Sequence, residues 1–352
     1  MVVVVGIDVH KMTHCAVAVD EAGRPLGQPL TVRATDAGHR QLLRWVRRQF
    51  AQEVVEFAVE DCRHVSLRLE RALLDAAVTA VRVPPKLMAQ TRTSARTRGK
   101  SDPIDALAIA RAALREPNLP RAEHTHASRE LKLLVDHRED LVRIRTGLQN
   151  RLRWRLHELD PEFDLPARGL DLIKHLDRTQ DRLGALPPST CRRLALEELA
   201  DIRAFTCRII AFEKEITELV RIQAPQLLAL PGCGPLTAAK LIGETANPVR
   251  FRSEACFAMH SGVAPIPASS GKTDRHRLAR GGNRQLNAAL HRIAVTQIRL
   301  DGLGRVYYQR RRAQGNTTME ALRALKRRLA RNVFNLLRPT DQLAAAPLPQ
   351  AA

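Results

Sequence analysis

The sequence predicts an α/β domain followed by a mainly helical remainder. Two observations support this class: short β-branched runs alternate with amphipathic stretches up to about residue 83, and long proline-free stretches with a leucine stripe come later. Aromatic residues make up only 3% of the 352 residues, so the cores must be aliphatic. At roughly 100–200 residues per domain, this length predicts two or three folding units.

Short apolar runs and amphipathic stretches fill the first 83 residues. We expect strands at residues 2–9, 15–20, 30–34, 54–59 and 78–83, and helices that begin at an Asp36 N-cap and cover residues 64–77. Pro84–Pro85 ends the last strand. The resulting order βββαβαβ is typical of a ribonuclease-H-like mixed sheet that opens with an antiparallel meander.

Four carboxylates fall near the ends of these elements. Asp8 lies in the first strand, Glu60 follows the fourth, and Asp102 and Asp105 begin a later helix. Residues three apart share one helix face, and neighbouring strands can bring Asp8 and Glu60 to one edge. A cluster of carboxylates repels itself unless a divalent cation neutralises it, and oxygen ligands suit Mg²⁺ or Mn²⁺. Such ions align and polarise a phosphodiester.

Each carboxylate also has a structural explanation when it is taken singly. Asp102 precedes Pro103 and is equally typical of a helix N-cap, and Glu60–Asp61 of a solvated strand end. The metal hypothesis therefore rests on the four residues together within this order of elements.

A basic segment, Lys86–Lys100, lies between these carboxylates. It contains five basic residues and no acidic one, namely Lys86, Arg92, Arg96, Arg98 and Lys100. A solvated face and a phosphate-binding surface are both compatible with such a run.

The middle of the chain predicts two long helices. From Ser128 to about Glu158 there is no proline, and a heptad stripe of apolar residues recurs at Leu134, Leu141, Ile144, Leu148 and Leu152. Prolines at 161, 166, 187 and 188 bracket an irregular or short-helical connector, and a second stripe runs from Leu199 to Leu219. An antiparallel coiled coil or bundle fits this pattern. Packing within one chain and dimerisation remain equally open.

A glycine turn opens the last third of the chain. Pro231–Gly232–Cys233–Gly234–Pro235 separates two apolar helical stretches. In a helix–hairpin–helix such a turn exposes backbone N–H groups of Gly232 and Gly234 to a DNA phosphate, whereas a plain turn between helices is the alternative.

A serine-containing loop follows within Ser261–Lys272. Pro265 and Pro267 prevent a regular helix, so Ser269 and Ser270 lie on a loop. Basic residues surround and follow the serines: Lys272, Arg275, Arg277, Arg280 and Arg284. Nearby cations can stabilise the charge that develops when a serine attacks a phosphodiester, although a Ser-Ser-Gly loop is by composition far more often only a loop.

The charge balance predicts a polyanionic partner. The formal net charge is +20 at pH 7, and Arg323, Lys326, Arg327 and Arg328 belong to a basic helical surface near the C-terminus. Residues 339–352 have little to bury and are expected to be a disordered tail. Six cysteines without a CxxC motif predict neither a disulfide framework nor a zinc site, and no apolar run reaches the length of a membrane span. We expect a cytoplasmic, nucleic-acid-facing protein.

These motifs together resemble the DEDD-type insertion-sequence transposases of the IS-one-ten family. The residues that carry the resemblance are Gly6–Lys11, Glu60, Lys100–Ala106, Leu230–Gly234, Gly262–Pro265 and Ser269–Lys272. The resemblance covers about residues 3–338. It implies a Holliday-junction-resolvase-like (RuvC-like) domain at 1–120, a helical coiled coil at 121–225, a transposase domain at 226–338 and the tail at 339–352.

The resemblance also implies roles for particular residues and partners. Asp8, Glu60, Asp102 and Asp105 would be the quartet that binds Mg²⁺, and Ser270 the nucleophile, with Ser269 as the alternative. Where many relatives have Glu-Ala-Thr-Gly, this chain has Glu60–Asp61–Cys62–Arg63, which leaves Asp61 as an alternative ligand.

Members of the family also use a structured non-coding bridge RNA that pairs with donor and target DNA, and they act as dimers or tetramers, associated with prokaryotic nucleoid DNA. Two other functions remain compatible with the residues: a metal-dependent junction nuclease without serine chemistry, and a non-catalytic nucleic-acid-binding scaffold.

Overall fold

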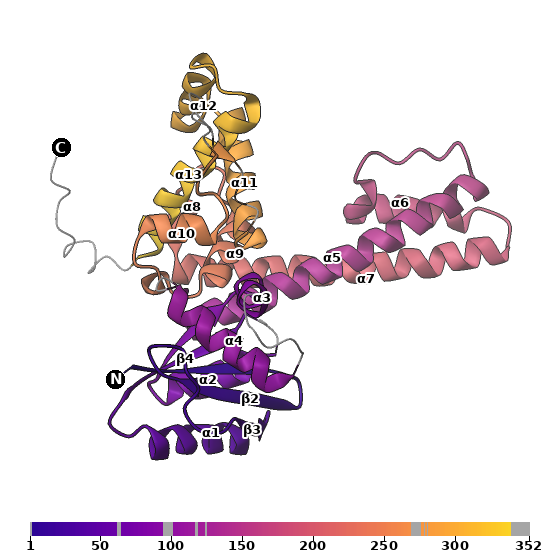
Figure 1. Cartoon of the computed structure of the whole chain (residues 1–352). Coiled ribbons are helices and arrows are strands. Elements are labelled where there is room, and N and C mark those ends of the chain that lie inside the picture. The colour runs from indigo at the N-terminus through magenta and orange to yellow at the C-terminus, as the bar shows by residue number, and fades with distance from the viewer. Residues whose placement is uncertain are drawn as a thin grey trace. The chain divides into compact units, whose positions relative to one another are not determined.

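The computed structural model describes residues 2–61, 65–93, 101–116, 119–123, 125–268, 276–277, 279 and 281–338. The chain divides into two compact units, the first comprising Met1–His124 and Val249–Arg252 and the second Thr125–Pro248 and Ser253–Ala352. Figure 1 labels their helices and strands.

A mixed five-stranded sheet forms the centre of the first unit. Its strands are β1 (Val2–Val9), β2 (Thr13–Val19), β3 (Leu30–Arg33), β4 (Val54–Glu60) and β5 (Thr79–Val83), in the spatial order β3-β2-β1-β4-β5. The pairs β1–β2 and β2–β3 are antiparallel, whereas β1–β4 and β4–β5 are parallel. The predicted order βββαβαβ is confirmed.

Helices cover both faces of this sheet. Helices α1 (Asp36–Gln49) and α2 (Leu67–Asp75) pack on the face that receives Val3, Val5 and Ile7 of β1. Helices α3 (Pro85–Thr93) and α4 (Asp102–Arg115) cover the other face, which receives Val4. Because strand side chains alternate between faces, Gly6 and Asp8 lie on the same face as Val4, beneath α3 and α4.

Two expected helix ends differ from the structure. Thr35, rather than Asp36, is the N-cap of α1, and its hydroxyl accepts a hydrogen bond from the Gly38 N–H at 3.2 Å. Asp36 is the first helical residue, where its charge interacts favourably with the helix dipole. Helix α2 occupies only part of the predicted 64–77, since it begins after Ser66.

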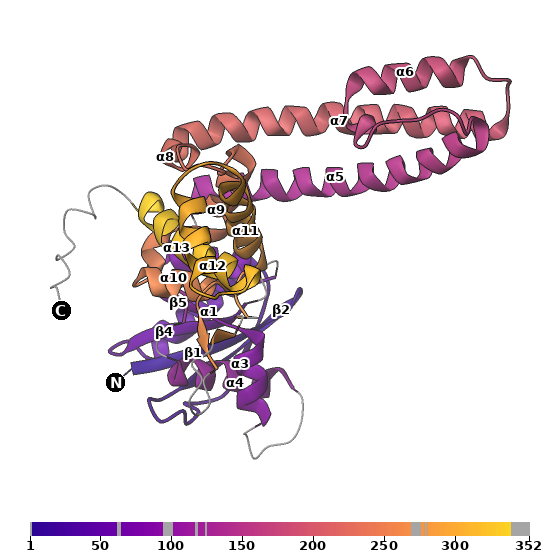
Figure 2. The same ribbon diagram turned by 90° about the horizontal axis from the view of Figure 1, so that it is seen from above.

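Two long antiparallel helices begin the second unit. Helices α5 (His126–Leu159) and α7 (Thr190–Gln223) lie side by side, and η1 (Gly169–Asp171) and α6 (Ile173–Gly184) connect their far ends (Figure 2). Leucines of all three α-helices form one core, which includes Leu152, Leu176 and Leu199. The predicted helical hairpin is confirmed. A supercoil and dimerisation remain predictions.

One residue of the predicted apolar stripe does not face the core. Ile144 is 51% exposed, and the neighbouring Arg145 is buried instead. The Arg145 guanidinium lies 2.8 Å from an Asp171 carboxylate oxygen and donates to the Thr206 hydroxyl at 3.2 Å, so contacts with η1 and α7 satisfy the buried charge.

The rest of the second unit is mainly helical. In chain order its elements are α8 (Pro225–Leu228), α9 (Pro235–Thr245), α10 (Glu254–His260), β6 (Ile266–Pro267), β7 (His276–Arg277), α11 (Arg284–Arg299), α12 (Leu303–Ala313) and α13 (Thr318–Leu337), and the short η2 (Pro248–Arg250) lies at the boundary with the first unit. Phe257 of α10 stacks on Phe334 of α13 with ring centroids 5.6 Å apart. Among the described residues, none of the helices combines the length and apolar composition needed to cross a membrane.

A buried pair of histidines joins the sheet to α1. His14 of β2 and His39 of α1 are almost fully buried, and their rings stack with centroids 5.3 Å apart. Their Nε2 atoms lie 3.3 Å apart. Burial, followed by the charge of His39, lowers the pKa of His14 to about 4. The folded protein therefore holds His14 neutral at pH values where the unfolded chain is protonated.

This pair makes the first unit sensitive to acid. As the pH falls from 7 to 5, the unfolded chain gains a proton at an ordinary pKa near 6.5 while folded His14 does not, so roughly 2 kcal/mol of unfolding free energy is lost at this site. We expect His14→Gln to flatten the dependence of chemical denaturation on pH over this range. His157→Gln, at an exposed position of α5, is the matched control. Equal slopes for wild type and His14→Gln would contradict the assignment.

Candidate active site

Asp8 lies near the C-terminal end of β1, under α4. Its neighbour in the parallel strand β4 is Glu60. The pairing of the two strands ends at Ile7 and Val59, and Asp8 and Glu60 are the next residues of their strands. Ala58 packs in the same cluster as Val4, so Glu60 and Asp8 share a face by strand alternation. Asp8 is only 4% exposed, whereas Glu60 is half-buried.

Helix α4 brings two further carboxylates to this face. Asp102 and Asp105 both lie in its first turn, Asp102 exposed and Asp105 buried. The N-cap position belongs to Ser101, so the alternative that Asp102 serves only as an N-cap is wrong. Negative charge in a first helical turn is stabilised by the helix dipole.

Asp8, His10 and Asp102 form a close polar cluster on this face. The His10 Nε2 lies 3.0 Å from an Asp8 carboxylate oxygen and 3.5 Å from one of Asp102. One potential ligand atom from each residue lies within 4.8 Å of the other two. His10 was not among the sequence candidates. The Asp-x-His spacing at the end of a strand was the available signal, but an Asp and a His at this spacing are common in proteins where they bind no ligand together.

The electrostatics of Asp8 reflect the surrounding carboxylates. Burial raises the pKa of Asp8, the nearby His10 lowers it, and the charges of Asp105 and Glu60 raise it further. The pKa of Cys15, which pairs with Asp8 across β1 and β2, is raised first by burial and then by the charges of Asp102 and Asp8. Glu60, Asp102 and Asp105 are therefore all close enough to act electrostatically at this end of the sheet.

The remaining sequence candidates of the first unit are described only in part. Asp61 is half-buried next to Glu60, and its N–H donates to the Val83 carbonyl at 3.0 Å. Cys62 and Arg63 lie outside the described residues. Of the basic segment, Lys86 and Arg92 belong to α3 but their side chains are not described, and Arg96, Arg98 and Lys100 lie outside the described residues.

The glycine turn of the second unit joins α8 to α9. Gly232 has φ +83°, and a Cβ there would lie 2.9 Å from the Thr296 Cβ, so the turn packs tightly against α11. Gly234 has extended backbone at the N-cap of α9, and Pro235 occupies the first turn of that helix. The helix–turn–helix order is as expected, while phosphate binding by Gly232 and Gly234 remains a prediction.

A short β-hairpin flanks the serine loop. Strands β6 and β7 pair antiparallel, Ile266 with Arg277 and Pro267 with His276. Ser269, Ser270, Lys272 and Arg275, and also Arg280, lie outside the described residues. Arg277 is exposed on β7, and Arg284 begins α11.

Glycines hold the base of this hairpin close to the start of α11. Gly262 has φ +64°, and a Cβ there would lie 2.7 Å from the Gly281 carbonyl oxygen. Gly282 has φ +90°, and a Cβ there would lie 2.7 Å from the Gly262 backbone nitrogen. Asn283 caps α11 by accepting from the N–H groups of Gln285 and Leu286. Its side-chain amide also donates to the buried Glu244, which forms an ion pair with Lys132 of α5.

Two protein-family models match the chain. The model of the IS110 DEDD transposases, described as a transposase, matches residues 5–161. The model described as the transposase IS116/IS110/IS902 family matches residues 224–309. The first match contains all four predicted carboxylates, and the second contains the glycine turn and both loop serines.

Several curated proteins are similar along the chain. A 44.8 kDa protein of insertion element IS116 from Streptomyces clavuligerus is 26% identical over 388 residues, covering 97% of this chain and 96% of its own length. A 42 kDa protein of IS900 from Mycobacterium paratuberculosis is 26% identical over 380 residues and covers 95% of each chain. A 43.6 kDa protein of IS110 from Streptomyces coelicolor is 37% identical over 131 residues, 36% of this chain and 32% of its own.

A solved structure of Thermus thermophilus RuvC in complex with a Holliday junction substrate also aligns, at 18% identity. The alignment covers 32% of this chain and 92% of that chain, with a TM-score of 0.25, which is too low to establish a common fold.

If the carboxylates share a cation, removing one of them must weaken its binding. We expect Asp102→Asn and Asp105→Asn each to reduce Mn²⁺ affinity about 10-fold or more, roughly 1.4 kcal/mol, in a calorimetric titration of the folded protein. Asp61→Asn is the matched control, and its effect should be small. Loss of binding in Asp61→Asn alone would show that Asp61, rather than Glu60, is the ligand.

Proposed function

Because this chain carries both domains of the IS116/IS110/IS902 family of transposases, we propose that it cuts and rejoins DNA for an insertion sequence. The structural observation that supports this function is the cluster of Asp8, His10 and Asp102 beside Asp105 at the end of a buried strand. Such a concentration of acceptors has no role in packing the sheet, and it suits chemistry on a phosphodiester.

The donor set of this cluster fits a divalent cation. Asp8 and Asp102 of this cluster, together with Glu60 and Asp105, whose charges act on Asp8, would hold Mg²⁺ or Mn²⁺, since oxygen is the ligand that these ions prefer. Bound there, the ion would polarise a scissile phosphodiester and stabilise its developing charge. His10 would keep the Asp8 carboxylate oriented through its 3.0 Å contact.

The covalent step is assigned to Ser270. Its Oγ forms a bond to the phosphorus of a DNA strand, the bond from that phosphorus to a sugar oxygen breaks, and the hydroxyl proton ends on the departing sugar oxygen. In rejoining, a sugar hydroxyl of the second strand attacks the phosphoserine, and Oγ recovers a proton. One phosphodiester is exchanged for another, so no external energy source is required. Ser269 is the alternative nucleophile.

Nucleic-acid contacts are assigned to the basic residues that flank both sites. They are Lys86, Arg92, Arg96, Arg98, Lys100, Lys272, Arg275, Arg277, Arg280 and Arg284, together with the turn glycines Gly232 and Gly234. A net charge of +20 with only 3% aromatic residues suits a protein that binds phosphates, while base pairing between nucleic-acid strands recognises the DNA sequence. A structured bridge RNA would supply that pairing, and a dimer or tetramer would bring donor and target DNA together.

A junction nuclease without serine chemistry is the second candidate. It is favoured by the carboxylate cluster itself, which lies entirely within the first unit and needs no residue of the second. A third function, a non-catalytic scaffold, requires nucleic-acid binding without strand cleavage.

The three functions differ in what they leave on the DNA. We expect Asp8→Asn, Glu60→Gln, Asp102→Asn and Asp105→Asn each to abolish cleavage of element-end DNA while binding persists. Ser270→Ala should abolish the covalent protein–DNA adduct seen on a denaturing gel, because the substitution removes the proposed attacking oxygen. Ser269→Ala, one residue away, is the matched control and should retain the adduct.

Each contrary result selects another function. Metal-dependent cleavage by wild-type protein without any adduct would identify the nuclease, and binding without cleavage would identify the scaffold. An adduct that persists in Ser270→Ala would move the nucleophile to Ser269 or to another residue.

A further inference from the structure

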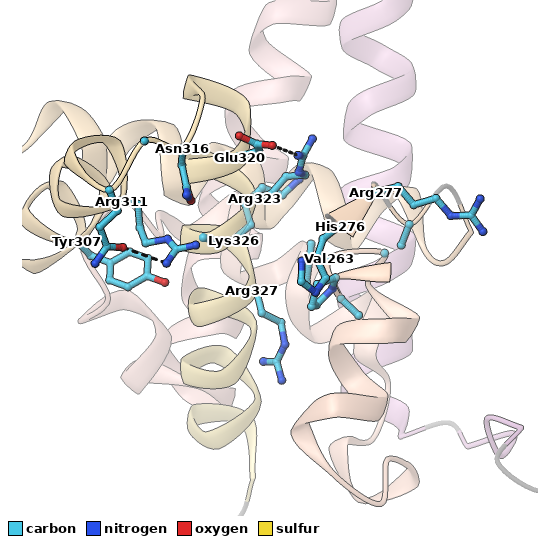
Figure 3. A pocket seen from close by; sticks show the side chains of 17 residues that line it. Val263, His276, Arg277, Tyr307, Arg311, Asn316, Glu320, Arg323, Lys326 and Arg327 are labelled. Carbon is cyan, nitrogen blue, oxygen red and sulfur yellow. Dashed lines mark hydrogen bonds and ion pairs between the residues drawn. The ribbon is translucent and has the colours of Figure 1, made fainter. Parts of the chain in front are cut away.

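A cavity of about 480 Å³ lies in the second unit beside the serine hairpin. Its walls come from the Gly262–Pro265 segment, from β7, and from α12 and α13, which contribute Tyr307, Arg311 and Lys326 (Figure 3). This volume falls within the roughly 300–1,000 Å³ of small-ligand sites. A cavity of this volume can admit one nucleotide unit of a strand.

Lys326 is a buried cation in the wall of this cavity. It is only 6% exposed, although the sequence placed it on a basic surface. Its ammonium donates to the Asn287 amide oxygen at 2.5 Å, and no carboxylate among the described residues forms an ion pair with it. Burial and then the charge of Arg284 lower its pKa to about 8. A buried charge without an opposite charge is costly, and an anion in the cavity would offset that cost.

Arg311 lines the same cavity and has an unsatisfied N–H group. One guanidinium nitrogen donates to the Gln314 side chain at 3.1 Å. Its Nε is buried and finds no acceptor within the described part of the chain. An arginine with free N–H groups matches the planar, two-point geometry of phosphate oxygens.

The acidic side chain of the cavity does not neutralise these cations. Glu320 accepts hydrogen bonds from the Thr317 N–H and hydroxyl, both at 2.8 Å, in the capping box of α13. Glu320 also lies 3.9 Å from the Arg323 guanidinium. Arg327, also in the wall, pairs with Glu254 of α10. Of the lining cations on α12 and α13, Lys326 and Arg311 form no ion pair with a carboxylate among the described residues, and Arg277 of β7 also lines the cavity.

We propose that this cavity binds a phosphodiester of a single DNA strand, with Lys326 and Arg311 as the charged donors. That the strand is DNA rests on the proposed function, because a transposase must bind DNA next to its serine loop. Asn287 links the pocket to that loop, since its amide donates to the Ser261 and Gly262 carbonyls at 3.1 and 2.9 Å while its oxygen accepts from Lys326. A bound phosphate would therefore also fix the segment that leads into the hairpin.

The test is binding of a fluorescent 12-nucleotide single-stranded DNA by the full chain over a range of salt concentrations. Arg311→Gln should weaken binding about 10-fold and reduce the salt slope by about 0.7, the value for one lost phosphate contact on a single strand. Arg299→Gln removes the same charge from an exposed position of α11 outside the cavity and should change affinity far less. Arg311→Lys, which keeps the charge but loses Nε, should fall between wild type and Arg311→Gln.

Three results would overturn the proposal. The first is an Arg311→Gln protein, folded by circular dichroism, that binds no more weakly than Arg299→Gln. The second is an equal loss of binding to duplex DNA, which would indicate an open surface. The third is a loss confined to RNA of the same sequence, which would assign the pocket to RNA. Because binding is measured without cleavage, any of these results would leave the proposed transposase activity standing.

Discussion

The missing side chain at Gly6 is the constraint on which the carboxylate site depends. A Cβ at this position would lie 2.1 Å from the Ala106 carbonyl oxygen and 2.5 Å from the Ala110 backbone nitrogen. Helix α4 can therefore cross β1 at backbone contact, aided by the alanines on its inner face. This crossing brings the first turn of α4, with Asp102 and Asp105, to the end of β1 that carries Asp8. A larger residue at position 6 would displace the helix and separate the carboxylates.

The serine hairpin of the second unit is held by a comparable close approach of backbones. Gly262 and Gly282 adopt positive φ angles and leave no room for a side chain, so the segments before and after the hairpin lie together. Below them, Lys132, Glu244 and Asn283 form a buried polar chain from α5 through α9 to the start of α11. Buried polar groups of this kind stabilise a structure only when each has its partner, which favours one fixed arrangement of these helices.

The sequence predicted those parts of the molecule that local patterns determine. The order of strands along the chain followed from the β-branched runs, and the positions of Asp8 and Glu60 at strand ends were enough to predict that the two could meet at one edge of the sheet. His10 escaped notice because its contact with Asp102 depends on how α4 crosses the sheet. The heptad pattern predicted that Ile144 is buried, whereas the neighbouring Arg145 is buried instead. The pattern takes no account of Asp171, whose carboxylate compensates the buried arginine. Lys326 seemed exposed for the same reason, since Asn287, its partner, lies on another helix. Partners on distant segments leave no local signal.

The most direct test of this account is Mn²⁺ binding by a Gly6→Ala protein, measured by electron paramagnetic resonance. Gly147→Ala, in α5, where a Cβ would meet nothing within 4 Å, is the matched control. If the backbone contact between β1 and α4 assembles the carboxylates, Gly6→Ala should lose at least about 10-fold in Mn²⁺ affinity, roughly 1.4 kcal/mol, while Gly147→Ala binds as wild type does. A folded Gly6→Ala protein with wild-type Mn²⁺ affinity would contradict the central claim.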